Sequence, residues 1–163
     1  MRIWDDLLDE VKKNLPDEIE CELKLMHSKS ALTRFANSQI HQNVDEESAE
    51  IYLTIHKDSK TTTISNNLTA IEDVGEFVKK ALDSLEDSPV DKGWSGLPDK
   101  SNSYDGYKDL EESNPDDRAR VVKEFIDEGK SLNGAGYCST YINNYFVWNS
   151  NGLHSSCLLY TSD

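Results

Sequence analysis

Two stretches of the 163-residue chain alternate strictly between apolar and polar residues. A period of two places successive side chains on opposite faces of a strand, so each stretch is predicted to be a strand with one buried face. The apolar positions are Ile19, Cys21, Leu23 and Leu25 in the first stretch and Ala49, Ile51, Leu53 and Ile55 in the second. Cys21 falls in the apolar phase, which predicts a small buried hydrophobe.

The apolar face of such a sheet needs a cover, and three segments with helical spacing can supply it. The first runs from Trp4 to Leu15 and is closed by Pro16. The second follows Thr69 and Glu72, which are spaced as a capping box. The third starts at Asn114-Pro115, a cap followed by a proline at the first helical position, and ends at Gly129 or at Asn133-Gly134. Its predicted buried stripe is Ala119, Val122, Phe125 and Ile126.

Several polar stretches are predicted to be turns. Asn37-Ser38 sits between two short extended segments, and this hairpin would place Phe35 opposite Ile40 and Arg34 opposite His41. The turn at 57–60 would return the chain as a strand at Thr61. We also expect a turn at 28–30, a polar connection at 45–47, and turns at 143–144 and 149–152 that bound strands at 137–142 and 145–148.

These elements predict an α+β fold, with an antiparallel sheet from Ile19 to Ser65 covered by helices that start near Ile3 and Thr69. Residues 87–113 show no convincing period. A connection of this length in a compact domain is usually functional or a linker. Its aromatic residues Trp94, Tyr104 and Tyr107 are expected to dock on the rest of the protein.

Charge and composition exclude several classes of function. A formal charge of −14 repels phosphates and anionic lipids, which argues against nucleic-acid and membrane partners. No apolar run approaches the length of a membrane span, and the N-terminus lacks the apolar region of a signal peptide. Three widely separated cysteines do not form a disulfide framework. A cytoplasmic location fits these features.

Few residues are arranged for chemistry. The four histidines, His27, His41, His56 and His154, are isolated, and none belongs to a helical zinc motif. We therefore predict no catalytic residues, no metal ligands and no cofactor within this chain. The polar face of the first hairpin, Arg34, Asn37, His41 and Gln42, is a candidate peptide-binding surface, and a solvated hairpin face is the alternative interpretation.

Three short motifs carry a family resemblance. "LTRFANSQIHQN" (32–43) is similar to the opening strands of the TldD/PmbA family of modulator-type metallopeptidases. "GWSGLPD" (93–99) resembles the Gly-Leu-Pro segment that follows the second helix of that family, and "WNSNGL" (148–153) resembles the turn at the entry to its second domain. The resemblance implies an N-terminal α+β domain over 1–132 and the start of a β-rich C-terminal domain over 133–155.

The resemblance also implies a function. Catalytic family members are zinc metallopeptidases that cleave small or unfolded peptides in an enclosed cleft, with the zinc ligands in the second domain. Family members form homo- or heterodimers, and some partners lack the metal. The chain is thus expected to be the N-terminal part of such a peptidase, helping to form a peptide-binding cleft, with zinc only in the full-length protein. The alternative is a non-catalytic α+β binding module or a metal-free partner subunit.

The last residues, 156–163, do not resemble the family and are similar to translated adapter sequence. We therefore predict that they are a non-native tail at the end of an incomplete gene. Deleting them should leave the melting temperature nearly unchanged. Thermal denaturation of the shortened chain tests this prediction, and a large fall in melting temperature would show that these residues are genuine structure.

Overall fold

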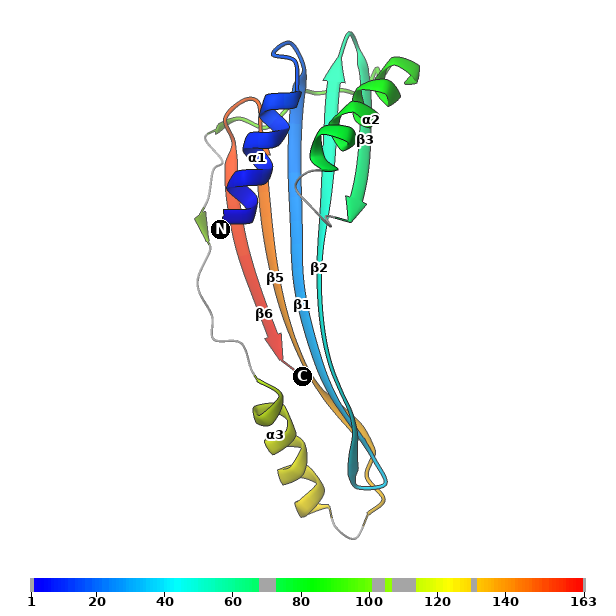
Figure 1. Cartoon of the computed structure of the whole chain (residues 1–163), viewed down its shortest axis with the longest axis vertical. Helices are drawn as coiled ribbons and strands as arrows, with labels where there is room; N and C mark the ends of the chain where they lie inside the picture. The colour runs from blue at the N-terminus through cyan, green and yellow to red at the C-terminus, as the bar shows by residue number, and fades with distance from the viewer. Residues whose placement is uncertain (1, 68–72, 101–104, 107–113, 130–131, 163) are drawn as a thin grey trace. The chain divides into compact units, whose positions relative to one another are not determined.

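The computed structural model describes residues 2–67, 73–100, 105–106, 114–129 and 132–162. The helices are α1 (Arg2–Asn14), α2 (Val74–Asp87) and α3 (Pro115–Glu128) (Figure 1). The strands are β1 (Glu20–Ala36), β2 (Gln39–Lys57), β3 (Lys60–Asn67), β4 (Asp105–Gly106), β5 (Gly136–Asn149) and β6 (His154–Ser162). The α+β class predicted from the sequence is confirmed.

The strands form one sheet in the order β3-β2-β1-β5-β6-β4. The five longer strands are antiparallel, and the two-residue β4 pairs in parallel with β6. The sheet is larger than predicted, because β5 adds to the free edge of β1 and β6 follows it. None of the described helices is long and apolar enough to cross a membrane.

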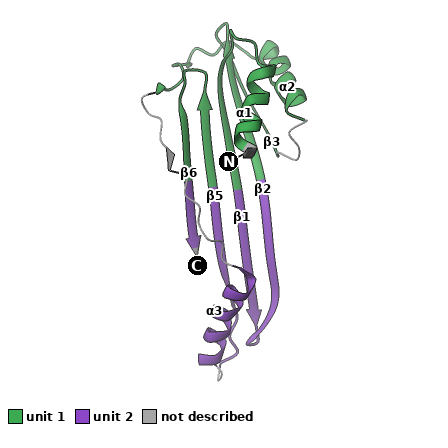
Figure 2. Ribbon diagram, turned by 60° about the vertical axis from the view of Figure 1, so that its left-hand side comes forward, with its two compact units in different colours: residues 1–27, 49–107, 144–157 green, residues 28–48, 108–143, 158–163 purple. Residues whose placement is uncertain are grey.

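The contacts divide the chain into two compact units (Figure 2). Unit 1 comprises residues 1–27, 49–107 and 144–157, and unit 2 comprises residues 28–48, 108–143 and 158–163. Each unit is therefore assembled from segments that are distant in sequence. The predicted boundaries at 132 and 155 refer to family domains and stay a prediction, as does the non-native tail, although its residues 156–162 belong to β6.

Unit 1 contains the main hydrophobic core. Helices α1 and α2 lie against one face of the sheet and contribute Trp4, Leu7, Val11, Phe77 and Val78, which pack against the predicted apolar positions of β1 and β2. These five helix side chains are at most 5% exposed, and of the predicted strand positions only Ala49 is partly rather than fully buried. The predicted apolar stripe of residues 4–15 and the predicted alternation of apolar and polar residues in β1 and β2 are confirmed. The predicted capping box at 69–72 lies outside the described residues. In the described part of the chain, α2 begins directly after its N-cap residue, Asp73.

Unit 2 has a smaller and more polar interior. Phe35 and Val122 are buried there, together with Thr33, Arg118 and Ser139. The predicted stripe of α3 is wrong in part, because Phe125 is 63% exposed while Arg118 is only 2% exposed. The helix is rotated so that it presents Arg118 to β2, and a paired arginine with its long apolar stem can occupy such a site.

Two hairpin turns are confirmed and three predicted breaks are wrong. Positive φ angles occur at Asn37 and Ser38 and at Asp58 and Ser59, as a two-residue hairpin turn requires. By contrast, β1 continues through 28–30, β2 through 45–47 and β5 through 143–144. Polar side chains there project from strands whose backbones are hydrogen-bonded to neighbours, so tertiary pairing overrides local preference.

The cysteines differ in environment, which leads to a labelling prediction. Cys21 is 2% exposed, and burial raises the pKa of its thiol to about 12, whereas Cys157 is exposed. Because the thiolate is the reacting form, we expect a maleimide or iodoacetamide to modify Cys157 readily and Cys21 only after unfolding. Mass spectrometry of tryptic peptides, with and without denaturant, measures both sites. Equal labelling of both in the native protein would contradict this prediction.

Candidate functional site

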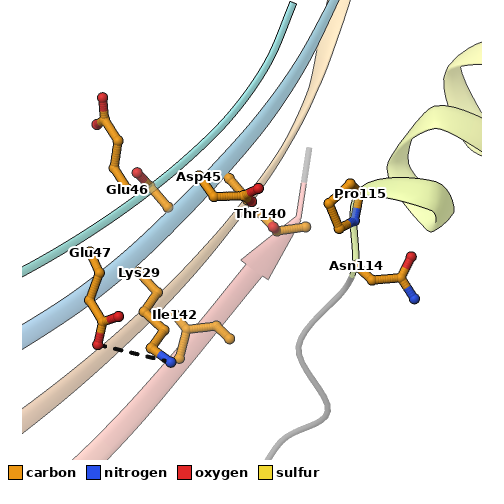
Figure 3. A pocket seen from close by; sticks show the side chains of 10 residues that line it. Lys29, Asp45, Glu46, Glu47, Asn114, Pro115, Thr140 and Ile142 are labelled. Carbon is orange, nitrogen blue, oxygen red and sulfur yellow. Dashed lines mark ion pairs between the residues drawn. The ribbon is translucent and has the colours of Figure 1, made fainter.

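The candidate site is a pocket of about 540 Å³ within unit 2 (Figure 3). Strands β1, β2 and β5 form its floor, and the start of α3 forms one wall. The lining residues are Lys29, Ser30, Ala31, Asp45, Glu46, Glu47, Asn114, Pro115, Thr140 and Ile142. All three strand segments belong to the regions of unit 2 where the sequence predicted turns or short strands.

The wall formed by α3 is fixed by its cap. The side-chain oxygen of Asn114 accepts a hydrogen bond of 2.9 Å from the backbone N–H of Asp117, and Pro115 occupies the first turn. Asn114 thus satisfies one of the free N–H groups at the start of the helix, and Pro115 lacks an N–H there. The predicted start of the third helix is confirmed.

Two ion pairs organise the charges of the pocket. Lys29 Nζ lies 4.0 Å from Glu47 Oε1, the pair drawn as a dashed line in Figure 3. Asp45 Oδ1 accepts a hydrogen bond of 2.7 Å from Arg118 Nη2, and the Arg118 side chain is only 1% exposed. The buried Arg118 guanidinium therefore holds the carboxylate of Asp45, a residue that lines the pocket, in a fixed position.

Arg118 is part of a wider polar network within unit 2. Its Nη2 also donates to Asn43 Oδ1 at 3.3 Å, and Thr33 Oγ1 donates to the same oxygen at 3.0 Å. These contacts connect α3 to both β1 and β2. Hydrogen bonds from several elements to one amide oxygen keep the edge of the pocket in a defined geometry.

The lining gives the pocket a definite chemical character. The lining side chains include three carboxylates, those of Asp45, Glu46 and Glu47, and a single lysine, and Thr140 adds a hydroxyl. Such a surface favours a ligand that donates hydrogen bonds or carries positive charge. Among the described residues, no group of three or more His, Cys, Asp or Glu is placed to hold a metal ion.

The predicted peptide-binding residues lie elsewhere in unit 2. Asn37 occupies the hairpin turn, while Arg34, His41 and Gln42 are exposed on the strands beside it. None of the four lines the pocket. Their proposed contact with peptide stays a prediction, and the structure places them on the hairpin end rather than in a cavity.

Sequence reasoning missed the residues that do line the pocket. Asp45, Glu46 and Glu47 were interpreted as a polar connection, because three consecutive acids resemble a solvated loop. Arg118 is absent from the buried stripe that the sequence predicts for α3. A signal is present in the flanking sequence: the extended segment after Asn37-Ser38 and the strand that starts at Ala49 are both predicted, and a continuous strand between them needs no loop.

The histidines are spread over strands β1, β2 and β6, with His27, His56 and His154 in unit 1 and His41 in unit 2. His56 Nδ1 lies 2.7 Å from Thr61 Oγ1, and His154 Nε2 accepts a hydrogen bond of 3.2 Å from the indole N–H of Trp4. The prediction that this chain holds no metal awaits metal analysis.

Comparison with known protein families finds no family profile that matches the chain, and comparison with curated proteins finds no match either. Solved structures do match. The crystal structure of TldE from Thermococcus kodakarensis superposes with a TM-score of 0.72 at 16% identity, covering 98% of this chain and 36% of that protein.

Two further crystal structures are of proteins described as candidate modulators of DNA gyrase. The Thermotoga maritima protein gives a TM-score of 0.62 at 15% identity, covering 99% of this chain and 37% of its own. The Bacteroides thetaiotaomicron protein gives a TM-score of 0.62 at 18% identity, and the match covers 96% of this chain and 38% of that protein. The chain thus spans little more than a third of the length of each. The resemblance to the TldD/PmbA family predicted from the sequence is confirmed as a likeness of fold to TldE and to these two proteins.

Proposed function

We propose that the chain is the N-terminal domain of a TldD/PmbA-like zinc metallopeptidase and contributes a wall of its peptide-binding cleft. The proposal includes a cytoplasmic location and a homo- or heterodimer with a family member. The observation that carries it is the match of 96–99% of this chain to only 36–38% of the length of each of the three structures. An activity that belongs to such longer proteins would need the remainder of their length.

The pocket of unit 2 supports a peptide as the ligand. Its acidic lining suits the ammonium or guanidinium group of a basic side chain or the amino terminus of a peptide. A volume of about 540 Å³ is in the range of sites for small ligands and accommodates one or two side chains. The pocket would bind and orient a peptide, while cleavage would take place outside this domain.

Zinc does not fit the described part of this chain. A catalytic zinc needs three converging protein ligands and an open position for water. His56 and His154 lie in separate hydrogen bonds, His41 is exposed near the first hairpin turn, and no group of potential ligands converges among the described residues. In this proposal the metal therefore belongs to a C-terminal domain, and no step of the reaction is assigned to residues described here.

The proposal predicts a difference between the chain and its completed form. The 163-residue chain should contain no stoichiometric zinc and should not hydrolyse peptides. The same domain fused to its downstream genomic sequence should bind about one zinc per chain and show chelator-sensitive cleavage. Metal analysis and a peptide-cleavage assay on both proteins measure this. Zinc-dependent cleavage by the chain alone would contradict the proposal.

The second candidate is a metal-free partner subunit or binding module. The acidic pocket favours it as strongly as the first, because binding a basic peptide needs no metal. The downstream sequence distinguishes the two candidates. A completed protein that binds basic peptides but neither contains zinc nor cleaves them would be the non-catalytic member.

A further inference from the structure

Residues 88–98 of unit 1, which we call the strap, form a connection attached at both ends. Near its start, the Asp91 N–H donates to the Ser59 carbonyl at 2.6 Å, and Val90 forms an isolated antiparallel β-bridge with Lys60. At its other end, the side-chain amides of Asn149 and Asn151 donate to the carbonyls of Pro98 and Leu97 at 2.8 Å and 3.2 Å. The strap therefore joins the β2–β3 turn to the β5–β6 turn.

The middle of the strap is held by Trp94, whose docking was predicted. Its ring stacks on His56 with centroids 4.5 Å apart and planes 7° from parallel. Its indole N–H donates to Glu20 Oε2 at 3.0 Å. Ile55 is fully buried against the helices, so the next residue, His56, points to the opposite face of the sheet. The strap thus crosses the face that α1 and α2 leave free.

The His56 ring is oriented by a chain of hydrogen bonds. His56 Nδ1 lies 2.7 Å from Thr61 Oγ1, and the Thr61 hydroxyl is also hydrogen-bonded to the Asp91 carboxylate. An ionised carboxylate only accepts, so the hydroxyl donates to Asp91 and accepts from Nδ1–H. The neutral ring then carries its proton on Nδ1, and further protonation adds a proton at Nε2 without breaking this chain.

Both carboxylates beside this cluster are placed to favour a positive ring. The Glu20 carboxylate on β1 accepts the hydrogen bond from the Trp94 indole, and the Asp91 carboxylate on the strap accepts the hydrogen bond from the Thr61 hydroxyl. The hydrogen bond from Thr61, and then that from Gly93, hold the pKa of Asp91 below its usual range, so Asp91 stays ionised in mildly acidic solution. The neighbouring cations are engaged elsewhere: Lys57 pairs with Glu18, and Lys60 donates to the Glu86 carbonyl, while Lys92 is exposed.

We propose that the strap is a proton-sensitive latch, in which protonation of His56 tightens the contact with Trp94 and holds the strap more firmly on the sheet. An imidazolium stacked on an indole gains a cation–π attraction that the neutral ring lacks. Histidine is the side chain whose charge ordinarily changes between about pH 5 and pH 8, so the test compares the protein at two pH values in that range. This inference does not depend on the proposed peptidase function.

Hydrogen exchange of the strap amides tests the latch. The N–H groups of Asp91 and Gly93 are hydrogen-bonded in the closed strap, to Ser59 and to the Asp91 side chain. After correction for the intrinsic exchange rate, their protection should be about two- to fivefold higher at about pH 5.5 than at about pH 7.5. The Leu15 N–H, which donates to the Val11 carbonyl at the end of α1 in the same unit, serves as the reference and should not share the change.

Two variants separate the latch from a general effect of pH. In His56→Gln the amide can still hydrogen-bond Thr61 but takes up no proton, and in Trp94→Leu the contact stays apolar but loses the aromatic face. Both should show equal strap protection at the two pH values. Equal protection in the wild-type protein, a pH effect that survives in His56→Gln, or an equal shift of the Leu15 reference would each overturn the proposal.

Discussion

Replacing Phe77 with aspartate is expected to abolish the cooperative folding of unit 1. Phe77 is 5% exposed and lies on α2 within the cluster that covers β1 and β2. The substitution places a carboxylate among apolar side chains and removes an aromatic ring, and each change alone costs several kcal/mol. The expected loss, more than about 4 kcal/mol, is a large part of the total stability of a small domain. Circular dichroism during thermal and urea denaturation measures it.

Phe125→Asp is the matched control for this experiment. Phe125 is 63% exposed on α3 and contacts Phe35 with ring centroids 5.6 Å apart. Its aspartate would be solvated, so the loss should be limited to about 1 kcal/mol for one aromatic pair. If Phe77→Asp melted like the wild type, or if both variants lost equal stability, the packing of α2 described here would be wrong.

Removing the carboxylate of Asp45 is expected to destabilise unit 2 by about 2 kcal/mol. This loss is smaller than the cost of breaking a fully buried ion pair, because the Asp45 side chain is more than half exposed. Asp45 is 59% exposed, but its partner Arg118 is 1% exposed and hydrogen-bonded to it at 2.7 Å. In Asp45→Ala the buried guanidinium loses that partner, because the arginine remains charged at any accessible pH.

Glu46→Ala provides the control, since it removes the same charge from the adjacent, exposed position of β2. We expect a change of at most about 0.5 kcal/mol there, as for most surface substitutions. Urea denaturation followed by the fluorescence of a probe on α3 would report the loss locally. An equal effect of both substitutions would mean that the Arg118–Asp45 pair does not hold α3 to β2.

The sequence predicted the elements whose pattern is local. The alternation from Ile19 to Leu25, the stripe that includes Trp4, and the Asn37-Ser38 turn each depend on residues close together in the chain, and all three are found. The continuous strands through 28–30 and 45–47 were missed. Their polar residues are held extended by neighbouring strands, and a local pattern does not show which strands pair.

The candidate pocket was missed for a related reason. Asp45 and Arg118 are 73 positions apart, and neither lies in a motif that marks a pair. A charged residue on a helix is usually solvated, and nothing in the local pattern of α3 marks Arg118 as buried. The three acids at 45–47 are exposed, but they lie on the continuous strand β2 and not in the predicted polar connection.

The position of β1 in the strand order has a consequence during synthesis on the ribosome. One neighbour, β2, follows directly, but the other, β5, begins about 100 residues after β1 ends. At a translation rate of about 5–20 residues per second, β5 would emerge roughly 5–20 s after its partner. During that interval one hydrogen-bonding edge of the nascent β1 lacks its native partner, and such edges recruit other chains. The growing chain is therefore most vulnerable to misassociation between the completion of α2 and the arrival of β5, the period in which a chaperone would have the greatest effect on yield.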